Sequence, residues 1–167
     1  RSTLFPYTTL FRSIADDGKI EQLAGKILTV GGKKFYEFTT PYFSTFALVD
    51  AEELGLEVNP KAMMLGVVSR LTDQKGFDLI AYMMDELCQD AIQLVVLGTG
   101  EEKYENMFRH FAWKYDKKVS ANIYYSEAMS HKIYAAADAF LMPSLFEPCG
   151  LSQLMSLRYG TVPIVRE

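Results

Sequence analysis

From residue 63 to the end of the chain, short uncharged apolar runs alternate with longer segments of helical periodicity. The apolar runs predict five buried strands, at residues 63–69, 93–97, 119–125, 139–142 and 162–165. The segments between them predict helices at residues 76–87, 101–114 and 132–137, and a further helix that begins at Gly150. Strands and helices that alternate in this way form right-handed βαβ units, so we expect an α/β fold with a doubly wound parallel sheet.

The loops that follow the first four predicted strands all leave the sheet at the same edge. Arg70, Gly100, Tyr125 and Glu147 lie in or at the start of these loops. Open α/β sheets bind their ligands at the carboxyl ends of their strands. The pattern therefore predicts one site to which all four loops contribute.

Glu147 is the acidic residue of the loop after the fourth strand, where it lies between Phe146 and Pro148. The helix that follows begins at Gly150, and its apolar residues recur at helical spacing. These apolar residues are Leu151, Leu154, Met155 and Leu157. The sequence thus places a carboxylate beside the N-terminus of a helix, at the expected ligand edge of the sheet.

Arg70 and Lys75 stand at the two ends of the short loop between the first strand and its helix. Two cations and the free N–H groups of a helix N-terminus form an arrangement that can bind an anion such as a diphosphate. From spacing alone, the simpler interpretation is that both are solvated surface charges. The loop therefore offers a candidate phosphate site that the local pattern does not prove.

Three other residues have both a functional and a structural interpretation. Gly100, in a Gly-x-Gly turn, would allow close approach of a ligand or simply tight packing, because the third glycine of a dinucleotide fingerprint is missing. Tyr125 would stack on a nucleobase or pack as an ordinary tyrosine at the end of its strand. His131, which follows an expected helix cap at Ser130, has no acid close to it in the sequence and is expected to be a surface residue.

Charge and cysteine content narrow the class of partner. A net charge of −4 gives no general attraction to nucleic acid or to anionic membranes. No apolar run reaches the roughly 18 residues of a membrane span, and no signal-peptide pattern is present. Cys88 and Cys149 have no metal-ligand spacing and are expected to be reduced thiols of a cytoplasmic protein. An activated thiol at Cys149, near a helix N-terminus, is the alternative, although no base adjoins it.

The first 61 residues divide into two parts. Residues 1–13 have no clean period and no acid, and they resemble translated sequencing-adaptor sequence more than a native edge strand. In residues 14–61, two β-prone runs at 27–30 and 33–38 flank Gly31-Gly32 and predict a hairpin. A helix at residues 46–54, capped by Ser44 and ended by Gly55, then leads to the main domain at residues 62–167.

Three stretches carry a resemblance to a known family. They read SRLTDQKG at residues 69–76, FEPCGLSQ at 146–153 and YGTVPIVR at 159–166. They resemble the nucleotide-binding half of the bacterial glycogen (starch) synthases, which are glycosyltransferases of the GT-B fold that use ADP-glucose. The resemblance extends over residues 52–167.

This resemblance implies retaining transfer of glucose from ADP-glucose, or from UDP-glucose, to the 4-hydroxyl of an α-1,4-glucan. Arg70 and Lys75 would bind the distal phosphate of the donor, and Glu147 would bind the transferred sugar. The remaining donor contacts would come from Gly100, Tyr125, Cys149, Gly150 and Leu151, with Tyr125 against the adenine. No metal and no separate cofactor are expected.

The resemblance also implies a Rossmann-like domain with the strand order 3-2-1-4-5, truncated after its fifth strand and lacking the N-terminal domain of the GT-B fold. The glycines at 31–32 do not match the sugar-nucleotide loop of that first domain, because Thr29 stands where its lysine should be. Two alternatives remain open. One is a nucleotide-binding fragment without activity, and the other is a different nucleotide-sugar transferase of the same fold, which Cys149, Gln153 and Met155 disfavour.

Overall fold

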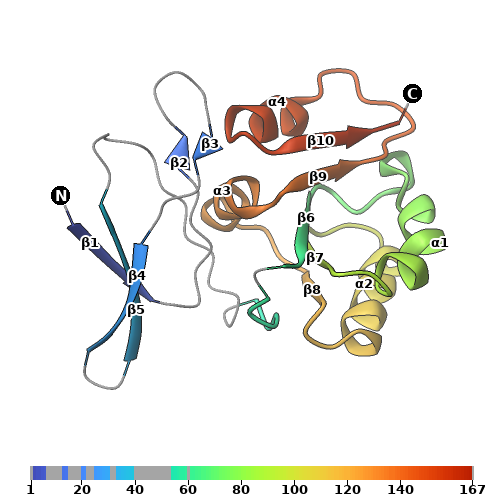
Figure 1. The fold of residues 1–167 in the computed structure, drawn as a ribbon. Helices are drawn as coiled ribbons and strands as arrows, with labels where there is room; N and C mark the ends of the chain where they lie inside the picture. The colour runs from blue at the N-terminus through green and yellow to red at the C-terminus, as the bar shows by residue number, and fades with distance from the viewer. Residues whose placement is uncertain are drawn as a thin grey trace.

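The computed structural model describes residues 2–6, 13–14, 20–21, 25–30, 33–39, 54–59 and 61–166 (Figure 1). A five-stranded parallel sheet forms the centre of residues 61–166. Its strands are β6 (Met63–Val68), β7 (Ile92–Leu97), β8 (Val119–Asn122), β9 (Ala139–Met142) and β10 (Val162–Val165). They follow the order β10-β9-β6-β7-β8, which confirms the predicted order.

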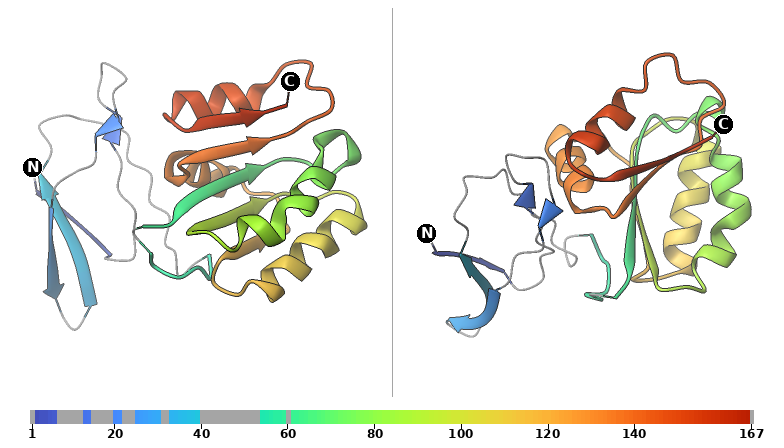
Figure 2. Two further views of the ribbon diagram at one scale, coloured as in Figure 1. Left: turned by 45° about the vertical axis from the view of Figure 1, so that its right-hand side comes forward. Right: turned by 45° about the horizontal axis from the view of Figure 1, so that its top comes forward.

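Helices cover both faces of the sheet, as expected for a doubly wound fold (Figure 2). The helices are α1 (Phe77–Leu87), α2 (Glu102–Lys114), α3 (Glu127–Ala136) and α4 (Leu151–Arg158). The first two cover one face, and α3 and α4 lie on the other. The predicted α/β architecture is therefore confirmed.

Alternation along β6 divides the core between the two faces. Leu65 and Val67 pack with α1 and α2, whereas Met64 packs with α3 on the opposite face. Gly66 also faces α3, and a Cβ atom there would lie 2.9 Å from Cγ2 of Ile133. A central strand buried on both faces explains why its sequence reads as a continuous apolar run.

The third strand is shorter than the sequence predicted. It ends at Asn122, which pairs with Leu97, the last residue of β7. Beyond that point β7 offers no further partner, so Tyr125 lies in the loop before α3 and does not end the strand. The expected helix start was also wrong, because Ser126 caps α3 by accepting a hydrogen bond from the N–H of Met129.

Ser130, the expected cap, lies inside α3 and donates its hydroxyl to the carbonyl of Glu127. The difference arises because both serines precede apolar residues at helical spacing, and only the extended backbone of Ser126 qualifies it as a cap. His131 accordingly lies within the helix and contacts the hydroxyl of Tyr159 through Nδ1.

Helix α4 does not bury the apolar residues that gave it its pattern. Within the described chain, its fully buried residue is Ser156, whereas its apolar side chains are exposed. They are Leu151, Leu154, Met155 and Leu157. The apolar side chains of the neighbouring strand β10 are also largely exposed.

Strands that precede the parallel sheet form two small sheets of their own. In the first, β5 (Lys33–Thr39) pairs antiparallel with both β4 (Gly25–Val30) and β1 (Ser2–Pro6). The second pairs β2 (Ser13–Ile14) with β3 (Ile20–Glu21). The predicted hairpin is confirmed, and the non-native origin of residues 1–13 stays a prediction. The expected helix at 46–54 lies outside the described residues apart from Leu54.

Candidate functional site

Four loops at the carboxyl ends of β6, β7, β8 and β9 form the candidate site. Because these strands are parallel, the loops meet at one edge of the sheet. The first of them contains a short 3-10 turn, η1 (Asp73–Lys75), and the last contains Glu147. Three of the predicted site residues come into contact there, because Glu147 contacts both Lys75 and Gly150.

Lys75 and Glu147 form an ion pair across the edge of the sheet. The Nζ atom of Lys75 donates to Oε2 of Glu147 at 2.5 Å, although the two residues are 72 positions apart in the chain. Their side chains are 18% and 24% exposed, so the pair is partly shielded from water but open on one side. A cation and an anion are thus held together where a ligand could reach both.

Three groups hold the Glu147 carboxylate in its ionised form. The ammonium of Lys75 has the largest effect, and the hydroxyl of Ser144 and the N–H of Gly150 also donate to the carboxylate. Together they lower the pKa of Glu147 below its usual value of 4.5. The site therefore presents a carboxylate, not a carboxylic acid, at neutral pH.

This depressed pKa predicts a pH-dependent contribution to stability. A carboxyl group with a lower pKa in the folded chain contributes stability that is fully present above its unfolded value of about 4.5 and is lost as the pH falls through the folded value. We expect urea midpoints of the wild type and of Glu147→Gln to differ most above the unfolded value of about 4.5 and to converge as the pH falls below it. A difference that stays constant over this range would contradict the prediction.

Gly76 sets the distance between the two loops that carry the ion pair. It caps α1 with φ of 69°, a left-handed conformation that favours glycine. A Cβ atom at this position would lie 2.0 Å from the carbonyl oxygen of Pro143, in the loop that leads to Glu147. The absence of a side chain thus allows the turn of Lys75 to lie directly against the neighbouring loop.

Arg70 lies on the same loop as Lys75 but has a different environment. Its side chain is exposed and makes no hydrogen bond or ion pair with the described part of the chain. The guanidinium therefore remains available to an anion at this edge. The structure does not bring Arg70 and Lys75 into contact with each other.

Gly100 owes its place to packing between two loops. A Cβ atom there would lie 2.2 Å from the carbonyl oxygen of Leu71, and one at Gly98 would lie 1.8 Å from that of Ser69. The N–H of Gly100 already donates to the carboxylate of Glu105 at 3.0 Å. Of the two interpretations of this turn, tight packing accounts for both glycines.

The other predicted contact residues lie around the same edge. Tyr125 is 85% exposed in the loop between β8 and α3, so its ring is accessible to a ligand. Cys149 is exposed and Gly150 is the N-cap of α4, while Leu151 is exposed in the first turn of that helix. Gly150 is the one that contacts Glu147, through its backbone N–H.

Three residues that the sequence did not single out complete the site. Ser144 donates its hydroxyl to Oε2 of Glu147 at 3.1 Å. Gln74 bonds to the loop that carries Glu147, and Asp73 bonds to α2. Gln74 and Asp73 stand within the stretch at 69–76 that carries the family resemblance, so they could have been selected there, but no local pattern indicates their partners.

The space between these loops is small. A cavity of about 10 Å³, lined in part by Ser69, Lys75, Pro143, Ser144 and Ser152, is about as large as a single water molecule requires. A ligand larger than a water molecule therefore does not fit inside this cavity.

Within the described residues, no group of three or more histidine, cysteine, aspartate or glutamate side chains has the arrangement of a metal site. None of the helices in that part of the chain is both long and apolar enough to cross a membrane.

Comparison with known proteins connects this chain to one family. Residues 52–167 match the family described as glycosyl transferases group 1. The chain is 77% identical over 116 residues to the glycogen synthase of Lachnospira eligens. The matched segment covers 70% of this chain and 24% of that protein. This chain is also 54% identical over 133 residues to the glycogen synthase of Clostridium acetobutylicum. That match covers 79% of this chain and 28% of the relative. The chain thus spans about a quarter of the length of these curated relatives.

Solved structures show the same fold. The catalytic domain of starch synthase IV from Arabidopsis thaliana, bound to ADP and acarbose, superposes with a TM-score of 0.62 at 36% identity, over 69% of this chain and 24% of that chain. A trehalose-6-phosphate synthase superposes with a TM-score of 0.51 at 15% identity, over 68% of this chain and 30% of that chain. The second similarity concerns the fold alone.

Proposed function

Because the chain belongs to the glycosyl transferases of group 1, we propose that it forms the nucleotide-sugar-binding part of a glycogen or starch synthase. The complete enzyme would transfer glucose from ADP-glucose to the 4-hydroxyl of an α-1,4-glucan, with retention of configuration and in the cytoplasm. Identity of 77% to a glycogen synthase over 116 residues supports this assignment. The second domain of the enzyme and the wall that binds the glucan acceptor would lie outside this chain.

The observation that carries the proposal is the ion pair of Lys75 and Glu147 at the ligand edge of the sheet. Donor binding would place the distal phosphate near Lys75 and Arg70 and the glucosyl ring near Glu147. Negative charge grows on the leaving diphosphate while positive charge grows on the ring. A fixed cation and a fixed anion at these two positions would stabilise the transition state electrostatically.

Transfer activity can be tested in a chimera. Residues 52–167 of this chain would replace the matching 116 residues of the 77% identical relative, which restores a complete enzyme around the site. We expect incorporation of labelled glucose into glycogen from ADP-glucose. A chimera that folds, as judged by its melting temperature, but transfers no glucose from ADP-glucose or UDP-glucose would contradict the proposed function.

The 167-residue chain itself should distinguish nucleotides by their phosphates. If Lys75 and Arg70 bind the distal phosphate, ADP gains one or two charge-assisted hydrogen bonds over AMP, each of about 1.5 to 3 kcal/mol. We expect ADP to bind at least tenfold more tightly than AMP, or about 1.4 kcal/mol, and adenosine to bind hardly at all. Isothermal titration calorimetry at moderate salt measures all three affinities.

A matched pair of lysine variants provides the control for this titration. Lys75→Ala should reduce the preference for ADP over AMP, and Arg70 would account for what remains. Lys114→Ala should preserve it, because Lys114 forms a similar ion pair with Asp85 between α1 and α2. Equal affinities of the wild type for ADP and AMP, or an equal effect of the two variants, would remove the phosphate site from the proposal.

Without the rest of the enzyme, we propose that the chain binds the donor nucleotide but does not transfer glucose. It spans 24% of the length of the relative to which it is 77% identical, and the acceptor would be held by parts of the enzyme outside that share. Glucosyl transfer by the isolated chain, measured under the conditions used for the chimera, would contradict this.

A further inference from the structure

We propose that Gln74 is a positioning residue, whose side-chain amide holds the Glu147 carboxylate in place for glucosyl transfer. The inference rests on the proposed function and adds a residue for which neither the sequence pattern nor the comparisons assign a role. Gln74 does not touch Glu147 itself. It acts through the backbone of Leu145 and Phe146, the two residues that precede Glu147.

Gln74 makes two hydrogen bonds to the loop after β9. Its backbone carbonyl accepts the N–H of Leu145 at 2.8 Å, and its side-chain Nε2 donates to the carbonyl of Phe146 at 2.7 Å. The residue after Gln74 contacts the residue after Phe146, because Lys75 bonds to Glu147. Two consecutive residues of η1 are therefore joined to three consecutive residues of the loop that carries the carboxylate.

Packing cannot replace these bonds, because the loop has little buried surface of its own. Leu145 is 58% exposed and Phe146 is 66% exposed. Neither residue belongs to a helix or a strand, so neither is held by regular backbone hydrogen bonding. The bond to Leu145 uses the backbone and would form with any residue at position 74. The bond to Phe146 requires a side-chain donor of the length of glutamine.

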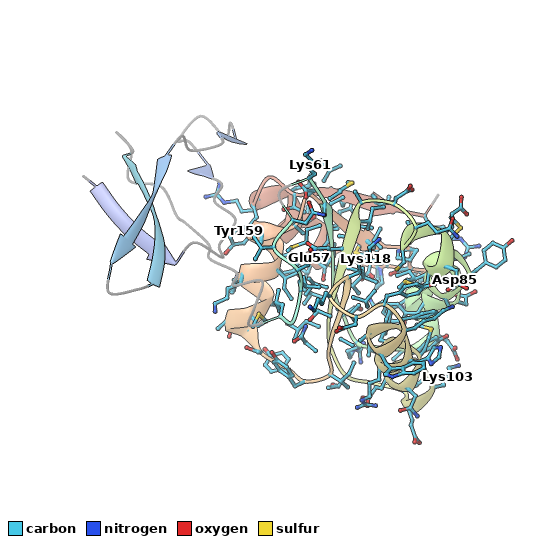
Figure 3. All side chains as sticks on the ribbon, turned by 60° about the horizontal axis from the view of Figure 1, so that its bottom comes forward. Glu57, Lys61, Asp85, Lys103, Lys118 and Tyr159 are labelled. Atoms are coloured by element: carbon cyan, nitrogen blue, oxygen red, sulfur yellow. The ribbon has the colours of Figure 1, made fainter. Side chains whose placement is uncertain are left out.

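The turn that carries Gln74 is itself fixed from the opposite side. Asp73 accepts hydrogen bonds from the hydroxyl of Tyr104 at 2.6 Å and from the ammonium of Lys103, both on α2. The N–H of Asp73 donates to the carboxylate of Glu101 at 3.1 Å. Figure 3 labels Lys103 at the outer side of the helices that cover this face of the sheet. Gln74 therefore extends from a turn that is anchored to α2 towards the loop of Glu147.

This arrangement predicts a specific kinetic effect. Removing the amide donor should let the Phe146 carbonyl and the adjoining carboxylate move while the phosphate-binding cation stays in place. A displacement of about 1 Å of a catalytic group can cost on the order of 100-fold in rate, so a partial loss of position should cost roughly tenfold. Donor affinity should change little, because Gln74 touches neither the phosphate-binding ammonium nor the exposed guanidinium on its loop.

The test uses the chimera with Gln74→Met, which keeps the length of the side chain and removes its donor. We expect kcat to fall roughly tenfold with KM for ADP-glucose and the melting temperature nearly unchanged. Gln89→Met is the matched control, because Gln89 is also exposed and its side chain makes no hydrogen bond within the described residues. That control should retain the kcat of the parent chimera.

A double-mutant cycle separates positioning from a general loss of structure. If Gln74 acts through Glu147, the double variant Gln74→Met with Glu147→Gln should be no slower than Glu147→Gln alone. Effects that multiply, or a Gln74→Met variant with unchanged kcat, would overturn the inference while the proposed function stands. A Glu147→Gln variant with normal kcat would overturn the role of the carboxylate, and this inference with it.

Discussion

The Glu147→Gln variant of the chimera is expected to transfer glucose about 100-fold more slowly than its parent, which corresponds to about 2.7 kcal/mol. The carboxylate would stabilise the positive charge that develops on the glucosyl ring, and that charge exists only in the transition state. Its loss should therefore lower kcat without weakening donor binding. Initial rates at saturating ADP-glucose, together with ADP affinity from calorimetry, measure the two effects separately.

Glu147→Gln should also leave ADP affinity unchanged or slightly increased. In the structure Lys75 donates to Glu147, so a neutral partner leaves the ammonium freer to bind phosphate. Lys75→Ala is the contrasting variant, and it should weaken ADP-glucose binding as well as slow turnover. If Glu147→Gln lost ADP binding while Lys75→Ala kept it, the two roles would be reversed. A normal kcat in Glu147→Gln would show that the carboxylate has no role in catalysis and that Glu147 only orders its loop.

Gly76→Ala is expected to destabilise the chain by about 3 kcal/mol. The left-handed backbone at this glycine costs about 1 to 2 kcal/mol with any other residue, and overpacking adds about 1 to 3 kcal/mol. The added Cβ would lie 2.0 Å from the carbonyl oxygen and 2.9 Å from the carbonyl carbon of Pro143, both backbone atoms that cannot rotate away. Urea unfolding followed by circular dichroism measures the loss.

Gly55→Ala provides a matched control for this substitution. Gly55 has the same φ of 69° as Gly76, but a Cβ atom there would meet nothing within 4 Å. We expect it to cost about 1 kcal/mol, from backbone strain alone. The difference between the two variants isolates the contact with Pro143. Equal urea midpoints for Gly55→Ala and Gly76→Ala would show that the neighbouring loop yields to the added methyl group.

The local sequence pattern was sufficient to predict the elements that depend only on their own residues. The apolar run of β6 predicts a strand buried on both faces, and the alternation of strands with helices predicts a doubly wound sheet. Gly150 is correctly placed at the start of α4, because a glycine between a loop and a helical repeat is a local signal. The strand order, in contrast, came from family resemblance and was then confirmed by the structure.

Local pattern failed where a neighbouring element decides the outcome. Tyr125 was expected to end its strand, but the strand stops at Asn122 because β7 ends at Leu97. Ser130 was expected to cap α3, but Ser126 has the extended backbone and the bond to the helix. The apolar face of α4 was detected correctly as a helical pattern, and only the structure shows that it is exposed. In each case the sequence carries the residues and the neighbouring element sets their role.

The sequence was enough to predict that Lys75 and Glu147 lie at the carboxyl ends of parallel strands, because strand periodicity and loop position are properties of consecutive residues. The tertiary structure was needed to show that these two side chains form one ion pair, that Gly76 lies against the loop of Pro143 and that Gln74 donates to the carbonyl of Phe146. Their partners are 72 positions away in the chain for both Lys75 and Gln74. Such contacts depend on how two βα units pack side by side, so the periodicity within either unit does not predict them.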